Sequence, residues 1–183
     1  MATPVGHALA GMVAGQAVTW RKPLLGPWKD IALFAALGVL ADLDFIPGLI
    51  AGKHDMYHHG VTHSLGAAVL MGLIMAMIGW KWGRAWRWGL MGFAVYFSHV
   101  LLDAVGQDTS IPYGVPLWWP LSDQYVMADW AFFLDIRRVP FGWPVIRHNL
   151  VAVGLEIVVL GPPALLVTWL RFRRNYAAFK SEG

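Results

Sequence analysis

The sequence contains no cysteine, which excludes disulfide bonds and thiolate metal sites. Any metal ion bound by this chain would therefore have nitrogen and oxygen ligands. Charged residues are also scarce: they make up 14% of the 183 residues, whereas 57% are hydrophobic and the mean hydropathy is +0.52. A soluble domain of this length surrounds its core with a more densely charged surface. The composition therefore predicts a protein that crosses a membrane several times.

Several apolar stretches predict an all-α bundle of about five transmembrane helices that forms one membrane-embedded domain over 1–183. The predicted spans are 4–20, 30–50, 61–80, 86–105 and 150–170. Gly11 and Gly15 form a Gly-x-x-x-Gly pair, which favours close helix packing either within the chain or between copies. The long segment 106–149 is rich in aromatic residues and proline, and is predicted to lie at headgroup level over the outer end of the bundle.

Lysine and arginine are divided unequally between the two faces that five spans create. One face would carry Arg21, Lys22, Lys29, Lys81, Arg84, Arg87, Arg171, Arg173, Arg174 and Lys180. The other face would carry only Lys53, Arg137, Arg138 and Arg147. The positive-inside rule then predicts an outer amino terminus and a cytoplasmic carboxyl terminus in the inner membrane. This asymmetry accounts for the net charge of +3 and the pI near 9.4 without a nucleic-acid partner.

Histidine and aspartate residues gather at the span ends that face outward in this topology. They are His7, Asp42, Asp44, His58, His59, His63, His99 and Asp103. Imidazoles and carboxylates in lipid are unfavourable unless they pair, line water or bind a metal ion. His99 and Asp103 are four residues apart and share a helical face, as His59 and His63 would if their helix began early enough. The pattern predicts one convergent site at the outer face.

The acidic residues of this group indicate what the site holds. Asp42 and Asp44 cannot share a helical face, but Pro47-Gly48 indicates that the helix ends there, and a looser backbone would let both carboxylates point inward. Together with Asp103, three charged aspartates deep in the bilayer would cost about 8 to 10 kcal/mol, close to the stability of a whole domain, about 5 to 15 kcal/mol. Divalent cations would convert this cost into binding energy. A bracing network of aspartate and histidine hydrogen bonds is the alternative.

Four segments carry a resemblance to a known family. They are Asp42-Leu43-Asp44, His58-His59-Gly60-Val61-Thr62-His63-Ser64, Ser98-His99-Val100-Leu101-Leu102-Asp103 and Gly114-Val115-Pro116-Leu117-Trp118-Trp119-Pro120. With the early His7, they resemble in order and spacing the LexA-regulated family of inner-membrane metal-dependent hydrolases, over about residues 1–121. That family usually has arginine where this chain has His59, and Gly60 aligns His58 with the family histidine. The pattern is also similar to that of zinc-dependent phospholipases C, which implies a phosphoester or lipid substrate by analogy.

The resemblance implies a metal-dependent hydrolase, and mixed histidine and aspartate ligands favour zinc, with manganese or iron as alternatives. Six or seven ligands are too many for one tetrahedral ion. We therefore expect two ions about 3.5 to 4 Å apart, bridged by Asp44 or Asp103, that activate a shared water as nucleophile. His59, if it is not a ligand, is predicted to donate a proton to the leaving group.

Glu156 is an unexpected acid about six residues into the last predicted span, about 9 Å below the outer surface at a rise near 1.5 Å per residue. It is either a further metal ligand or a partner of Arg147 or His148. The full set of candidate ligands is His7, Asp42, Asp44, His58, His63, His99, Asp103 and Glu156.

The outer segment supplies the predicted substrate contacts, because its aromatic faces would guide a lipid headgroup towards the metals. The candidates are Trp118, Trp119, Ser122 and Asp123. The predicted function is hydrolysis of a lipid or lipid-linked phosphoester, or an ester, at the outer leaflet. A metal-binding scaffold or sensor and a metal or proton transporter are the alternatives. The near absence of polar residues in the cytoplasmic half of the spans argues against a transport pathway.

Overall fold

The computed structural model describes residues 2–52, 58–109, 111–137 and 142–181, with side chains described up to Arg174. Within these residues the chain is all-helical, as predicted, apart from two isolated β-bridges. The helices are α1 (Pro4–Val18), α2 (Pro27–Gly38), α3 (Phe45–Ile50), α4 (Leu65–Trp80), α5 (Ala85–Ala104) and α6 (Trp143–Ser181), with two 3₁₀ turns, η1 (Leu40–Asp44) and η2 (Val61–His63).

The helix lengths do not confirm five membrane spans. In the described residues only α6, over Trp143–Arg174, is by itself long and apolar enough to cross a membrane. Helix α2 and the segment Leu40–Ile50 pass the same test only as a pair bent by 45°, and α4 is apolar but has 16 residues. Each predicted span nevertheless corresponds to helix: the second is broken at η1, and the last lies inside a longer helix that begins at Trp143.

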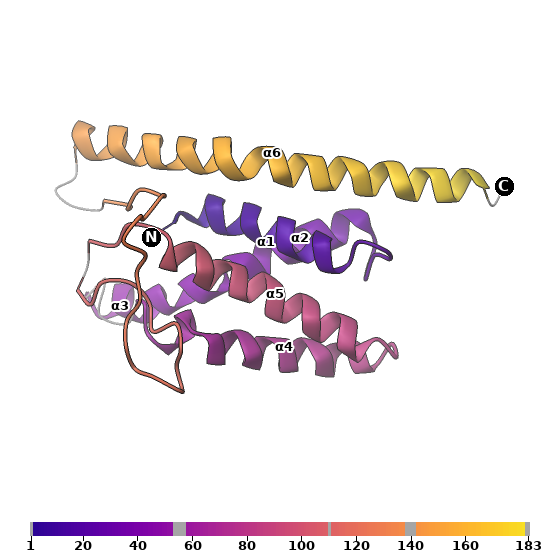
Figure 1. The fold of residues 1–183 in the computed structure, drawn as a ribbon, viewed down its shortest axis with the longest axis horizontal. Helices are drawn as coiled ribbons and strands as arrows, with labels where there is room; N and C mark the ends of the chain where they lie inside the picture. Colours follow the sequence, from indigo (N-terminus) through magenta and orange to yellow (C-terminus); the bar gives the residue numbers. More distant parts are fainter. Residues whose placement is uncertain (1, 53–57, 110, 138–141, 182–183) are drawn as a thin grey trace.

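The helices pack closely where glycine allows it. Figure 1 shows α4 and α5 as an antiparallel pair, with α1 beside α5 and α6 running along one side of the bundle. A Cβ atom on Gly15 would lie 2.3 Å from Cγ of Phe34, and one on Gly11 would lie 2.7 Å from the carbonyl oxygen of Phe34. The Gly-x-x-x-Gly pair therefore serves a contact between α1 and α2 within the chain. Phe34, Met91 and Val95 are fully buried in the resulting core.

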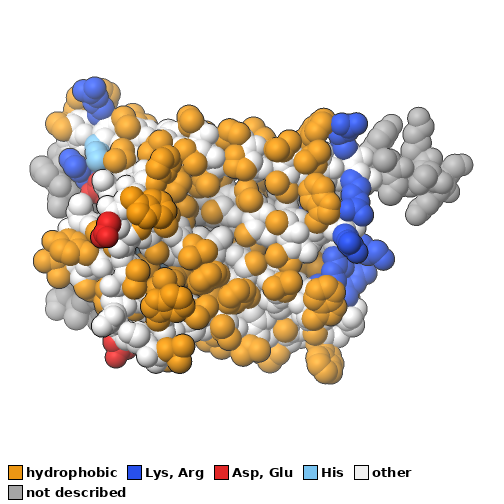
Figure 2. All heavy atoms as spheres, viewed as in Figure 1, with side chains coloured by type: hydrophobic (Ala, Val, Ile, Leu, Met, Phe, Trp, Pro, Cys, Tyr) orange, Lys and Arg blue, Asp and Glu red, His pale blue; other side chains and the backbone are white. Residues whose placement is uncertain are grey.

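The two ends of the bundle differ in charge. Figure 2 shows most of the visible lysine and arginine side chains at one end, next to a belt of hydrophobic side chains that covers the middle of the molecule. The described basic residues of this end are Arg21, Lys22, Lys29, Lys81, Arg84, Arg87, Arg171, Arg173 and Arg174. At this end Gln16 donates a hydrogen bond to Thr168 (2.9 Å), and Arg171 forms a buried ion pair with Asp30. We call it the basic end.

The opposite end is covered by the segment between α5 and α6, as Figure 1 shows. We call the described residues of 105–142 the cap segment. Backbone hydrogen bonds hold it against the ends of α4 and α5. The N–H groups of Leu65 and Gly66, at the start of α4, donate to the carbonyls of Leu117 and Trp119, both at 2.9 Å. The N–H of Ala128 donates to the carbonyl of Ala104 at 2.8 Å. The cap segment thus closes over the end of the bundle that carries the predicted histidine and aspartate residues.

Candidate metal centre

Seven of the eight predicted metal ligands come together under the cap segment. α1 contributes His7, η1 contributes Asp42 and Asp44, the turn before η2 contributes His58, η2 contributes His63, and α5 contributes His99 and Asp103. Six of them, together with His59, form three overlapping groups whose ligand atoms lie within 4.8 Å of one another: His7, His99 and Asp103; Asp42, His63 and His99; and His58, His59 and His63. Asp44 joins the cluster through contacts with His58 and His63. Elements far apart in sequence therefore build one continuous cluster.

Four nitrogen–oxygen separations in this cluster are close to those between ligands of one ion. Nε2 of His99 lies 3.1 Å from Oδ2 of Asp103 and 3.6 Å from Oδ1 of Asp42. Nε2 of His63 lies 3.6 Å and 3.7 Å from the same two oxygens. Ligands of a tetrahedral zinc ion, each bound at about 2.0 to 2.2 Å, are about 3.4 Å from one another. The observed separations therefore suit one tetrahedral cation.

The partners of the Nδ1 atoms of His63 and His99 indicate which ring nitrogen carries the proton and which is free to bind a metal ion. Nδ1 of His99 lies 2.8 Å from the carbonyl oxygen of Gly38, so Nδ1 carries the proton and Nε2 keeps its lone pair. Nδ1 of His63 lies 3.2 Å from Oδ2 of Asp44, which also accepts the hydroxyl proton of Thr62 at 2.6 Å. Both Nε2 atoms are then acceptors that face carboxylate oxygens. A cation between them would satisfy these atoms, and a further proton on the His63 ring, in a histidine–aspartate network, is the alternative. Carbonyl or carboxylate support of the far nitrogen is typical of metal-binding histidine.

Buried nitrogen and oxygen atoms without hydrogen-bond partners also support a metal ion in this cluster. Within the described residues, Nε2 of His7, His63 and His99 and Oδ2 of Asp103 make no hydrogen bond, although each residue is buried. The ring of His7 stacks on that of His99 with centroids 3.6 Å apart, and its Nε2 lies 3.3 Å from Oδ1 of Asp103. Unsatisfied buried polar atoms are rare in folded proteins. Their concentration here fits a divalent cation.

The other two histidines of the cluster, His58 and His59, are paired with carboxylates. Nδ1 of His58 is 2.8 Å from Oδ1 of Asp44, and Nδ1 of His59 is 3.1 Å from Oδ2 of Asp108. Residue 59 adopts a left-handed backbone (φ 64°), and α4 begins only at Leu65. His59 and His63 therefore do not share a helical face. Burial lowers the pKa of His59 and outweighs the hydrogen bond that the ring donates to Asp108, which raises it, so the neutral form is favoured.

Asp108 is the residue that sequence reasoning missed. Its Oδ2 accepts a hydrogen bond from the backbone N–H of Gly114 at 2.9 Å, in addition to its contact with His59. Gly114 opens the fourth segment of the family resemblance, but nothing in that segment points to Asp108. His59 and Asp108 are 49 residues apart in the sequence, and they meet because the cap segment turns back over the bundle.

Glu156 stands apart from the cluster, and neither predicted role is observed. Its Oε1 accepts a hydrogen bond from the N–H of Thr3 at 2.6 Å, and its Oε2 accepts from the N–H of Gly6 at 3.0 Å and from the Thr3 hydroxyl. His148 instead contacts Asp135 at 3.0 Å. A carboxylate at the amino end of a helix satisfies free N–H groups and complements the helix dipole. Glu156 is therefore a cap for α1.

The predicted substrate residues lie on the cap segment, and one of them lines a groove. Trp119 lies with Pro120 and Leu121 against Leu65 and Leu70 of α4, along an apolar groove of about 450 Å³. Leu65, which lines this groove, follows His63 by two positions in the sequence. Among the other candidates, Trp118 is half exposed, Asp123 is exposed, and Ser122 accepts a hydrogen bond from the N–H of Gln124 at 3.2 Å.

Comparison with known proteins places the chain among inner membrane proteins. A sequence model of the YdjM inner membrane protein family matches residues 1–179. The chain is 36% identical over 155 residues to inner membrane protein YbcI of Escherichia coli (strain K12), which covers 78% of this chain and 84% of that protein. No solved structure matches the sequence significantly. The names of these relatives describe a membrane location and state no activity.

Proposed function

We propose, on the basis that this chain belongs to the YdjM inner membrane protein family, that it is a multi-pass membrane protein with a metal-dependent hydrolase site near the outer surface. Five helical segments would cross or enter the bilayer. Helix α5, with 20 residues, is about 30 Å long, which matches the hydrocarbon thickness. The basic end would face the cytoplasm and the cap segment would face outward, as the positive-inside rule requires.

The single observation that carries the hydrolase proposal is that Nε2 of His63 and of His99 each lie within 3.1 to 3.7 Å of carboxylate oxygens of both Asp42 and Asp103. We assign the first ion to His63, His99, Asp42 and Asp103, with His7 beside them. The second ion of the pair is assigned to the neighbouring His58 and Asp44, with Asp44 or Asp103 as the bridging carboxylate, which leaves His59 free for proton transfer. Zinc is the favoured metal, with manganese and iron as alternatives, because the ligands are imidazole and carboxylate only.

The chemistry follows from the ligand set and its surroundings. Ions of this kind, when bound, lower the pKa of a coordinated water and polarise a phosphoryl or acyl oxygen. Nε2 of His59 is buried without a hydrogen bond in the described residues, while Nδ1 is held by Asp108. Because the neutral form of His59 is favoured, Nε2 can take a proton from the attacking water and return it to the leaving group. Asp108 acts through His59 as a positioning residue.

The substrate class is a lipid or lipid-linked phosphoester, or an ester. The groove between α4 and Trp119 is lined almost wholly by apolar side chains and begins next to the metal-binding turn η2. An acyl or prenyl chain lying in this groove would bring its polar end towards His63. Transport is disfavoured because the fully buried Phe34, Met91 and Val95 fill the core between the candidate site and the basic end.

The test is metal analysis combined with assay of purified variants. We expect about two equivalents of a transition metal per chain, and hydrolysis of generic phospholipid phosphodiesters or esters. Asp103→Ala and His63→Ala should lose both metal and activity, whereas Asp123→Ala, on the exposed part of the cap segment, should keep its metal. Full activity in the first two variants would refute the hydrolase proposal. Retained metal without activity on any lipid would favour a non-catalytic scaffold.

A further inference from the structure

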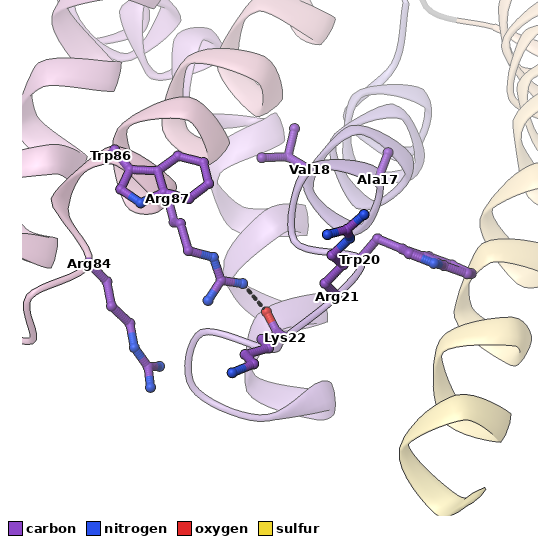
Figure 3. A pocket seen from close by; sticks show the side chains of 8 residues that line it. All are labelled: Ala17, Val18, Trp20, Arg21, Lys22, Arg84, Trp86 and Arg87. Carbon is purple, nitrogen blue, oxygen red and sulfur yellow. Dashed lines mark hydrogen bonds between the residues drawn. The ribbon is translucent and has the colours of Figure 1, made fainter. Parts of the chain in front are cut away.

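A pocket lined by basic side chains lies at the basic end, at the opposite end of the bundle from the histidine cluster. It has a volume of about 600 Å³ and is formed by the end of α1, the turn that follows, and the start of α5. Figure 3 shows its two walls: Trp20, Arg21 and Lys22 on one side, and Arg84, Trp86 and Arg87 on the other. The guanidinium of Arg87 donates a hydrogen bond to the carbonyl oxygen of Lys22, which joins the two walls.

The pocket concentrates positive charge that no acid among the described residues neutralises. Four of its lining residues are cationic and none is acidic. The acid described at this end, Asp30, is buried and already accepts hydrogen bonds from Arg171 and from the N–H groups of Leu24 and Leu25. In the described part of the chain, Arg21, Lys22 and Arg84 form no ion pair with a carboxylate. Cations held together in this way attract an anion.

The shape and surroundings of the pocket fit a phosphate group at a membrane surface. Two arginines on opposite walls can donate paired N–H groups to phosphate oxygens. The pocket also lies at the amino end of the 20-residue helix α5, whose dipole favours an anion there. Trp20 and the exposed Trp86 flank the cations, and tryptophan is enriched at the headgroup level of membranes.

We propose that this pocket binds the phosphate of an anionic phospholipid in the leaflet at the basic end. Free phosphate has the same chemistry, but the tryptophan rings and the hydrophobic belt that begins beside the basic end (Figure 2) favour a headgroup with attached acyl chains. Basic pockets between membrane helices on the cytoplasmic side suit this kind of ligand. The lipid would link α1 to α5 through both walls.

The test compares two double variants with the same loss of charge. Arg21→Gln/Arg84→Gln removes one cation from each wall, and both side chains are exposed, so the fold should be unaffected. Lys29→Gln/Lys81→Gln removes two exposed cations from the same end that do not line the pocket. Retention of phosphatidylglycerol and of phosphatidylcholine by the full chain in detergent is measured by native mass spectrometry over a lipid titration.

We expect the unaltered chain to retain phosphatidylglycerol in preference to phosphatidylcholine. At about 1 kcal/mol per cation, the pocket variant should bind phosphatidylglycerol about 25-fold more weakly, and the control variant should change less than about 3-fold. Equal losses in both variants, or equal retention of the two lipids, would overturn the proposal. Inorganic phosphate is titrated as a third arm: if it fully displaces phosphatidylglycerol at low concentration, the pocket is a free-anion site and the lipid assignment is wrong.

Discussion

The carboxylate of Glu156 holds the amino end of α1 by accepting hydrogen bonds from the backbone N–H and the hydroxyl of Thr3. This contact joins residues 153 positions apart and lies one turn before His7. The N–H of the preceding residue, Ala2, donates to Oδ1 of Asp103 at 3.1 Å. Helix α6 thus helps to position a candidate metal ligand without contributing one.

Replacement of Glu156 by alanine separates these two roles. Glu156→Ala should lower the free energy of unfolding by about 1 to 3 kcal/mol, since it leaves buried donors of α1 without partners, but the purified variant should still bind metal. His63→Ala, the matched ligand variant, should lose metal. Elemental analysis and thermal unfolding in detergent measure both effects. Loss of metal from Glu156→Ala without loss of stability would restore Glu156 to the ligand set.

The buried ion pair between Arg171 and Asp30 fastens α6 to α2. Arg171→Met leaves the carboxylate of Asp30 buried without its cation, and should lower the free energy of unfolding by about 3 to 5 kcal/mol. The double variant Asp30→Asn/Arg171→Met should recover much of this loss, because no unpaired charge remains. Thermal unfolding in detergent is the measurement. A double variant that is no more stable than Arg171→Met would contradict this account.

Close packing between α1 and α2 makes Gly15 sensitive to a single methyl group. Gly15→Ala places a Cβ atom 2.3 Å from the ring of the fully buried Phe34, and should cost about 1 to 3 kcal/mol of stability. Gly154→Ala in α6 is the control, since its Cβ atom meets nothing within 4 Å and alanine favours helix by up to about 1 kcal/mol. Equal unfolding midpoints in both variants would argue against this helix contact.

The pairing of His59 with Asp108 predicts that changes at these residues slow the proposed hydrolysis without reducing metal binding. His59→Gln should reduce the proposed hydrolysis by about 100-fold or more, and Asp108→Asn by about 10- to 100-fold because it misorients the ring. In Asp108→Asn the metal content should stay at the level of the unaltered chain. Turnover under saturating substrate, assayed beside metal content, distinguishes the two effects. Unchanged turnover in both variants would remove His59 from the mechanism.

Metal removal should weaken the fold, because the cluster joins α1, η1, η2 and α5. A ligand present at 100 times its dissociation constant stabilises the folded state by about 2.7 kcal/mol. Treatment with a chelator should therefore lower the unfolding midpoint, and added zinc should restore it. His63→Ala should show no such response. A midpoint that does not respond to chelator in the unaltered chain would contradict a metal that links these elements.

Much of the site could be predicted from the sequence because its residues occur in short local patterns. His99 and Asp103 share a face through helical periodicity alone. A helix break near Asp42 and Asp44 was also predicted, but it precedes Pro47-Gly48, which lie inside α3 and do not end the helix there. The contact of His59 with Asp108 could not be predicted, because it depends on how the cap segment folds back. The role of Glu156 could not be predicted either, since no local sequence pattern indicates that Thr3 donates hydrogen bonds to an acid 153 positions away.

The amino-acid sequence by itself determined the all-helical class, the apolar segments and the residues that gather at one end, because these depend on composition and on periodicity along one segment. The tertiary structure decided which atoms face one another: that Nε2 of His63 and His99 point at Asp42 and Asp103, that Glu156 caps α1, and that Gly15 meets Phe34. Such contacts join residues remote in sequence, and their geometry depends on the packing of all the helices together.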